Sequence, residues 1–64
     1  MQFKELDIVR ILSDSHDKIQ AGDIGVIIMV FNSPNVAYEV EIISSDIQIQ
    51  DTFLPEEIEL YHEI

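Results

Sequence analysis

The longest apolar run of the chain covers residues 26–31 and follows two glycines, Gly22 and Gly25. Its length and its β-branched residues predict a central strand over residues 25–31. Gly22 lies beside an aspartate, where a turn often needs a positive φ angle. Gly25 stands at the start of the strand and indicates a bend or a close approach of another backbone. We therefore expect a tight turn that leads into the central strand.

Alternation along this strand predicts which side chains reach the core. Those at even positions are expected to fill it, and they are Val26, Ile28 and Val30. Those at odd positions point the other way, and they are Ile27, Met29 and Phe31. Because this second set is also apolar, a loop, a terminus or a partner must cover it. We predict that it forms the apolar anchor of a partner-binding surface.

Four more strands are predicted around the central one, over residues 7–12, 36–43, 47–54 and 58–61. Polar segments separate them: a loop at 13–21, turns at 32–35 and 44–46, and a short helical turn at 55–57. Five short antiparallel strands favour a closed barrel, because closure hides unpaired strand edges. The expected core consists of Val9, Ile11, Val26, Ile28, Val30, Val40, Ile42, Ile49 and Leu60.

Two groups of polar residues have the side-chain types of a chemical site. Asp14, His16 and Asp17 are metal ligands by type, but one loop without a second cluster is more typical of a solvated segment. Glu39 and Glu41 share one outer face of a strand, whereas acid–base work needs a cleft and unequal environments. Without a nucleophile–base pair or a phosphate loop, we expect no enzyme and no cofactor.

Length and composition limit the classes of protein to which the chain can belong. The chain has 64 residues and no cysteine, so residues 1–64 are expected to form one domain without disulfides. A chain of this size buries only about 60% of its unfolded surface. Oligomerisation, as a homo-oligomer, or a partner would supply the missing stability. The absence of an export-like apolar start or a membrane-length apolar run predicts a cytoplasmic protein.

The charge pattern narrows the choice of partner. The net charge is −10, and all three Lys and Arg residues lie before residue 19. Direct nucleic-acid binding is therefore disfavoured, and a basic protein partner is favoured. Solubility is the simpler interpretation of the same charge. The acids expected at the partner-binding surface are Glu39, Glu41, Asp46 and Asp51, with Glu56, Glu57 and Glu59 extending it.

Four segments in this order resemble a family of small bacterial proteins of unknown function, common in cyanobacteria. They are residues 7–12 (DIVRIL), 21–27 (AGDIGVI), 37–42 (AYEVEI) and 54–60 (LPEEIEL). The family pattern has Thr where this chain has Val26 and Phe where it has Ile42. The resemblance implies an SH3-like barrel and no catalytic residues.

Several functions follow from resemblance alone. The family's association with toxin-like and accessory genes implies an antitoxin or immunity role, which suits a non-enzymatic inhibitor of a basic protein. Residues 22–28 are also similar to the core of KOW modules in ribosomal and transcription-elongation proteins. Similar barrels serve as docking subunits, as in the nitrile hydratase β-subunit and a peripheral photosystem I subunit. Fold likeness alone does not choose among these alternatives.

Overall fold

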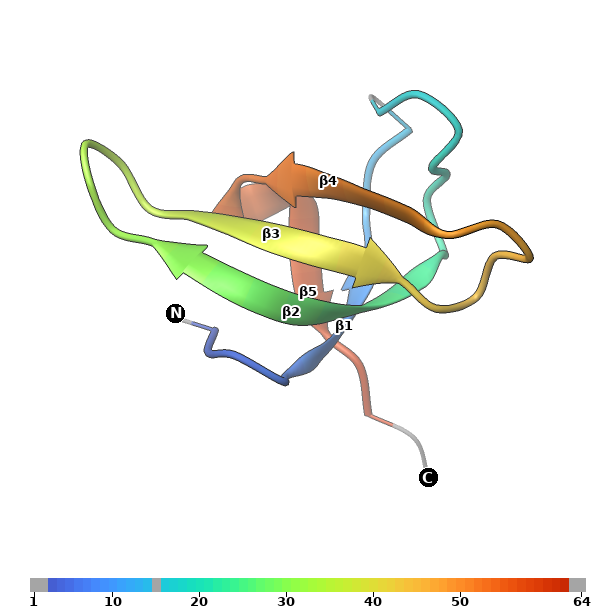
Figure 1. The fold of residues 1–64 in the computed structure, drawn as a ribbon, viewed down its shortest axis with the longest axis horizontal. Helices are drawn as coiled ribbons and strands as arrows, with labels where there is room; N and C mark the ends of the chain where they lie inside the picture. The colour runs from blue at the N-terminus through green and yellow to red at the C-terminus, as the bar shows by residue number, and fades with distance from the viewer. Residues whose placement is uncertain (1–2, 15, 63–64) are drawn as a thin grey trace.

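The computed structural model describes residues 3–14 and 16–62, which form a five-stranded antiparallel sheet (Figure 1). The elements are β1 (Ile8–Ile11), β2 (Ile24–Phe31), β3 (Ala37–Ile42), β4 (Ile49–Phe53), the 3-10 helix η1 (Pro55–Glu57) and β5 (Ile58–Leu60). The all-β, SH3-like prediction is confirmed, including the helical turn before the last strand. Each predicted strand is present, although four of them are shorter than expected.

The sheet is open, and the expected closure into a hydrogen-bonded barrel is wrong. Its strand order is β4-β3-β2-β1-β5, so β4 and β5 are the two edges. In Figure 1, β2 and β3 cross the front of the molecule while β1 and β5 run behind them. The segment that joins the edges bonds within itself, since the Glu57 N–H donates to the Leu54 carbonyl at 2.9 Å. Pro55 has no N–H to offer a neighbouring strand.

A β-bulge divides β2 into two parts whose side chains alternate in opposite phase. Ile27 lies opposite Val40 and Met29 opposite Glu39, so Ile28 is the extra residue. Before the bulge, Ile27 shares the core side of the sheet with Val40 and is 0% exposed, whereas Ile28 is 37% exposed. An extra residue reverses the alternation beyond it, so Met29 faces outward and Val30 is partly buried opposite Tyr38. The prediction that Ile28 is buried and Ile27 points outward is therefore wrong.

Outside the bulge the expected core is largely correct. Four expected residues are buried, namely Val9, Ile11, Val40 and Ile42. Val30, Ile49 and Leu60 are partly buried against them. Val26 is half-buried on the outer side of β2, opposite Glu41, which corrects its expected place in the core.

The described core also includes residues from outside the strands. Phe3 packs its ring edge-on against Tyr38, with 5.3 Å between ring centroids, and its N–H donates to the Tyr38 hydroxyl at 3.1 Å. Ile19 anchors the loop between β1 and β2 and is 2% exposed. Phe3 and Ile19 thus add apolar side chains from outside the strands to the core that the sheet surrounds.

The Gly22 turn is confirmed, with a φ angle of 98°. A β-carbon there would meet no atom within 4 Å, so only the backbone angle resists substitution. Gly22→Ala should therefore lower the free energy of unfolding by about 1 kcal/mol. Urea denaturation measures the change, with Gly22→Asn as a milder companion because Asn tolerates positive φ better. An unchanged or increased stability for the alanine variant would contradict this expectation.

Candidate functional site

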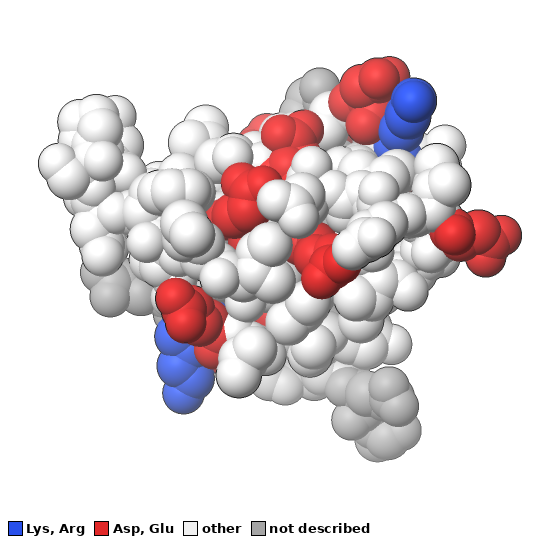
Figure 2. All heavy atoms as spheres, in the orientation of Figure 1, with Lys and Arg blue, Asp and Glu red and all other residues white. Residues whose placement is uncertain are grey.

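The outer side of β2, β3 and β4 brings together part of the predicted partner-binding surface. The strand register aligns Met29 with Glu39 and Thr52, and it aligns Val26 with Glu41 and Gln50. We call these six residues the outer acidic face. Figure 2 shows acidic side chains in the middle of the visible face, separated by uncharged ones.

Neutral donors from β4 and the turn before it hold the two carboxylates of this face. The Thr52 hydroxyl donates to Glu39 Oε1 at 2.6 Å, and Gln50 Nε2 donates to Glu39 Oε2 at 3.0 Å. Gln48 Nε2 donates to Glu41 Oε2 at 3.2 Å. No ion pair within residues 3–14 and 16–62 involves Glu39 or Glu41. Both carboxylates are thus oriented while their charge is not balanced by a nearby cation.

The remaining predicted contact residues separate into different places. Met29 and Phe31 are 49% and 37% exposed, with Phe31 opposite Ala37 at the end of the β2–β3 pair. Ile27 is fully buried, so its assignment to the apolar anchor is wrong. Asp46 is exposed in the turn after β3. Asp51 lies opposite the buried Val40 and therefore faces away from Glu39 and Glu41.

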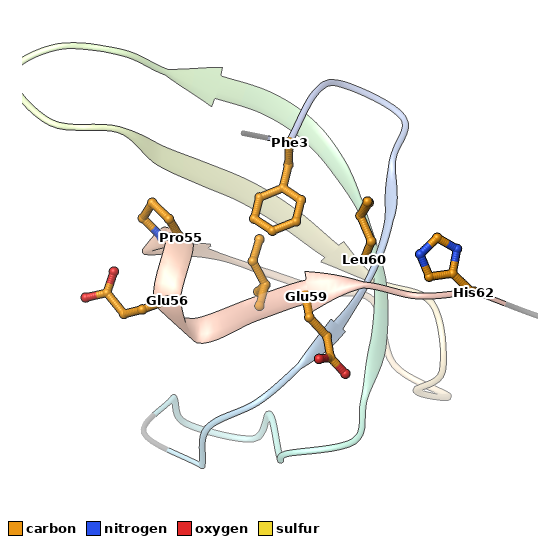
Figure 3. Close-up of a pocket in the computed structure, with 7 residues that line it drawn as sticks. Phe3, Pro55, Glu56, Glu59, Leu60 and His62 are labelled. Atoms are coloured by element: carbon orange, nitrogen blue, oxygen red, sulfur yellow. The ribbon is translucent and has the colours of Figure 1, made fainter. Parts of the chain in front are cut away.

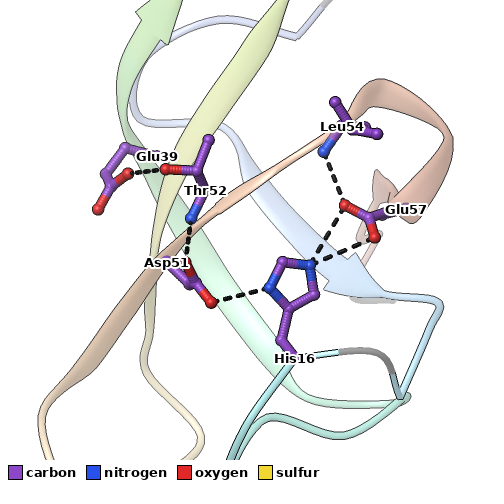
Figure 4. A network of polar contacts seen from close by, with 6 residues as sticks. All are labelled: His16, Glu39, Asp51, Thr52, Leu54 and Glu57. Atoms are coloured by element: carbon purple, nitrogen blue, oxygen red, sulfur yellow. Dashed lines mark hydrogen bonds and ion pairs between the residues drawn. The ribbon is translucent and has the colours of Figure 1, made fainter.

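Asp51 belongs instead to a polar cluster around His16, drawn in Figure 4. His16 Nδ1 lies 2.8 Å from Asp51 Oδ2, and its Nε2 lies 3.3 Å from both oxygens of Glu57. The imidazole also packs on the Phe53 ring at a centroid distance of 4.0 Å. The sequence predicts a solvated loop at 13–21, but the His16 side chain is only 15% exposed. His16 thereby connects this loop to β4 and η1, where the backbone leaves the sheet open.

Sequence reasoning missed this cluster because its members are 35 and 41 positions apart. A histidine in a polar loop carries no local signal that it will meet two carboxylates. The expected neighbours of His16 have other roles: Asp14 Oδ1 accepts the Ala21 N–H at 2.7 Å, and Asp17 is exposed. In the described residues, no group of three or more His, Asp or Glu side chains has an arrangement that could hold a metal.

Protonation strengthens the His16 cluster because a doubly protonated imidazole can donate to both carboxylates at once. Burial by itself would lower the pKa of His16, but hydrogen bonds to Asp51 and Glu57 and their charges outweigh it and raise this pKa above 6.5. The hydrogen bond from His16 lowers the pKa of Asp51 below 3.8, against the effect of burial. The two shifts describe one interaction between a cation and a carboxylate.

The His16 cluster should make stability depend on pH. A raised pKa stabilises the fold fully below the ordinary value of 6.5 and loses that contribution as pH rises through the folded-state value. Because Asp51 is 47% exposed, solvent screening limits the effect to about 0.5–1 kcal/mol. Between pH 5.5 and pH 8.5, the free energy of unfolding of the wild type should therefore fall by about 0.5–1 kcal/mol more than that of His16→Gln, as measured by urea denaturation. His62→Gln is the control for the loss of a histidine outside the cluster. Equal slopes for wild type and His16→Gln would contradict the expectation.

Comparison with known proteins identifies a family of small domains without an assigned activity. The family model described as Domain of unknown function (DUF4926) matches residues 5–50, more than half of the chain. The chain belongs to this family. The matched segment includes β1, β2 and β3, and therefore the central strand and both glutamates of the outer acidic face.

Neither a curated protein nor a solved structure matches the chain. Within the described residues, no helix has the length and apolar character needed to cross a membrane.

Proposed function

We propose that this protein is a non-enzymatic binding module that docks a basic protein through its outer acidic face. The observation that carries the proposal is the exposed Met29 beside Glu39 and Glu41, whose carboxylates are oriented by neutral donors and have no cation in the described structure. Such a surface can accept Lys or Arg side chains without first breaking an ion pair.

The two parts of the surface would act at different stages of binding. The negative field of a chain with net charge −10 attracts a basic partner over long range and raises the association rate. The exposed side chains of Met29 and Phe31 supply apolar contact, whose loss mainly speeds dissociation. Carboxylates that are already held by Thr52, Gln50 and Gln48 have less freedom to lose on binding.

The finer proposal is an antitoxin- or immunity-type inhibitor of a basic protein. An acidic module that covers a basic active surface would inhibit it by occupying it, with no catalytic group of its own. A docking subunit of a larger complex would use the same face but leave the partner active. Activity of the isolated partner with and without this protein separates the two.

A KOW-like role at RNA is less well supported by the charges on the molecule. Such a module needs a basic patch for phosphates. Arg10 pairs with Glu59, while Lys4 and Lys18 lie on two separate loops.

Removing the two charges of the outer acidic face should slow association with the partner. The partner is first captured from the native cell extract, purified and measured by stopped-flow binding across a salt series. The double variant Glu39→Gln and Glu41→Gln should associate about tenfold more slowly at low salt and show a weaker salt dependence. The double variant Glu5→Gln and Asp17→Asn removes the same net charge from other exposed positions and should have a smaller effect.

Three outcomes would contradict the proposed function. If the captured partner is acidic, or if the association rate does not respond to salt, the charge serves solubility alone. Equal slowing by both double variants would show that net charge, and not the outer acidic face, sets the association rate.

A further inference from the structure

A cavity of about 530 Å³ opens beside β5, at the unclosed edge of the sheet (Figure 3). Its apolar lining consists of Phe3, Pro55, Ile58 and Leu60. Glu56, Glu59 and His62 complete the wall. In Figure 3 the Phe3 ring points toward β5, whereas the Glu56 and Glu59 carboxylates point away from the apolar centre. The cavity therefore has an apolar floor and a polar rim.

Among residues 3–14 and 16–62, only β1 pairs with the backbone of β5, and it does so on one side. Two hydrogen bonds to β1 and its flanking residues mark the ends of the paired side. The Tyr61 N–H donates to the Ile8 carbonyl at 2.9 Å, and the Leu12 N–H donates to the Glu57 carbonyl at 2.8 Å. Alternate residues of an antiparallel strand direct their backbone groups to opposite sides. Ile58 and Leu60 thus direct theirs away from β1, and neither has a backbone hydrogen bond to another described segment.

An added strand would meet two chemically different faces here. On the core side it would pass the cavity and the apolar side chains of Ile58 and Leu60. On the outer side it would pass Glu59, with the exposed Glu56 at one end; Glu59 also pairs with Arg10. Side chains of a strand alternate between the same two faces. The matching sequence consequently alternates apolar residues with Lys or Arg.

We propose that the open edge of β5 binds an extended segment of a basic partner in which apolar residues alternate with Lys or Arg. Main-chain hydrogen bonds to Ile58 and Leu60 would hold the segment, and one apolar side chain would enter the cavity. The inference rests on the proposed binding function but assigns a second surface, at β5, which runs behind β2 and β3 in Figure 1.

The test uses the whole protein, labelled with ¹⁵N, and the peptide acetyl-Val-Lys-Val-Lys-Val-amide as the probe. Its addition at millimolar concentration should shift the amide signals of Phe3, Ile58 and Leu60. Replacing both Lys by Glu in the peptide should weaken binding about tenfold, because opposite charges become like charges across the pair. N-methylation of the peptide at alternate residues should abolish binding, because it removes the donors that pair with β5.

The results separate this inference from the proposed function. The proposed contact of the peptide's Lys side chains with Glu59 is supported if Glu59→Gln weakens binding of the lysine peptide while Glu39→Gln does not. Shifts confined to the outer acidic face, no shifts at all, or equal binding of the N-methylated peptide would each overturn the β5 inference. The salt-dependent kinetics of Glu39 and Glu41 would remain as the separate test of the proposed function.

Discussion

Replacing Ile27 with alanine should lower the free energy of unfolding by about 2–5 kcal/mol, whereas Ile28→Ala should cost less than about 1 kcal/mol. The two residues are adjacent and chemically identical, so the difference between the two losses of stability reports only their positions in the fold. Ile27 is fully buried opposite Val40, and Ile28 is the exposed extra residue of the bulge. Truncating Ile27 leaves a cavity in the core, but truncating Ile28 removes atoms that partly contact water.

Urea denaturation of both variants at one pH measures this contrast. A domain of this size has about 3–10 kcal/mol of stability in total, so Ile27→Ala should unfold at a clearly lower denaturant concentration or be unfolded from the start. The Ile28→Ala variant serves as the matched control for expression and solubility. Equal losses, or a larger loss at Ile28, would contradict the placement of Ile27 in the core and of Ile28 outside it.

Gly25→Ala should destabilise the fold by about 3 kcal/mol, because the new methyl group has no space. A β-carbon at Gly25 would lie 2.4 Å from Val40 Cγ1 and 2.8 Å from the Glu41 carbonyl oxygen. The Val40 side chain can rotate only within a packed core, and the carbonyl belongs to the β3 backbone beside β2. The clash can be relieved only by moving the two central strands apart.

The same denaturation experiment tests Gly25→Ala, with Gly22→Ala as its control. Both variants add one methyl group and remove the same glycine flexibility, but only Gly25 lacks space for it. The loss at Gly25 should therefore exceed the loss at Gly22. A Gly25→Ala variant as stable as the wild type would show that β2 and β3 are less closely packed than described.

Local sequence patterns determined the number and order of the strands, the helical turn before β5 and the roles of both glycines. Alternation in residues 37–42 predicted β3 with its buried side chains correctly, since each side chain there keeps its face along the strand. The positive φ of Gly22 was also evident from the neighbouring residues. These features depend on interactions within a few positions of each other. For Gly25 the sequence left a bend and a close backbone approach open, and the contact with β3 decides for the close approach.

Tertiary structure alone decided three features. The bulge at Ile28 depends on how β2 pairs with β3, and an apolar run shows no preference between its two faces. The His16 cluster joins residues from a loop, β4 and η1, whose meeting no spacing predicts. The unpaired edge of β5 depends on the separation of β4 from β5 in space. In all three, the deciding contacts join segments far apart in the chain, so the local pattern is compatible with more than one outcome.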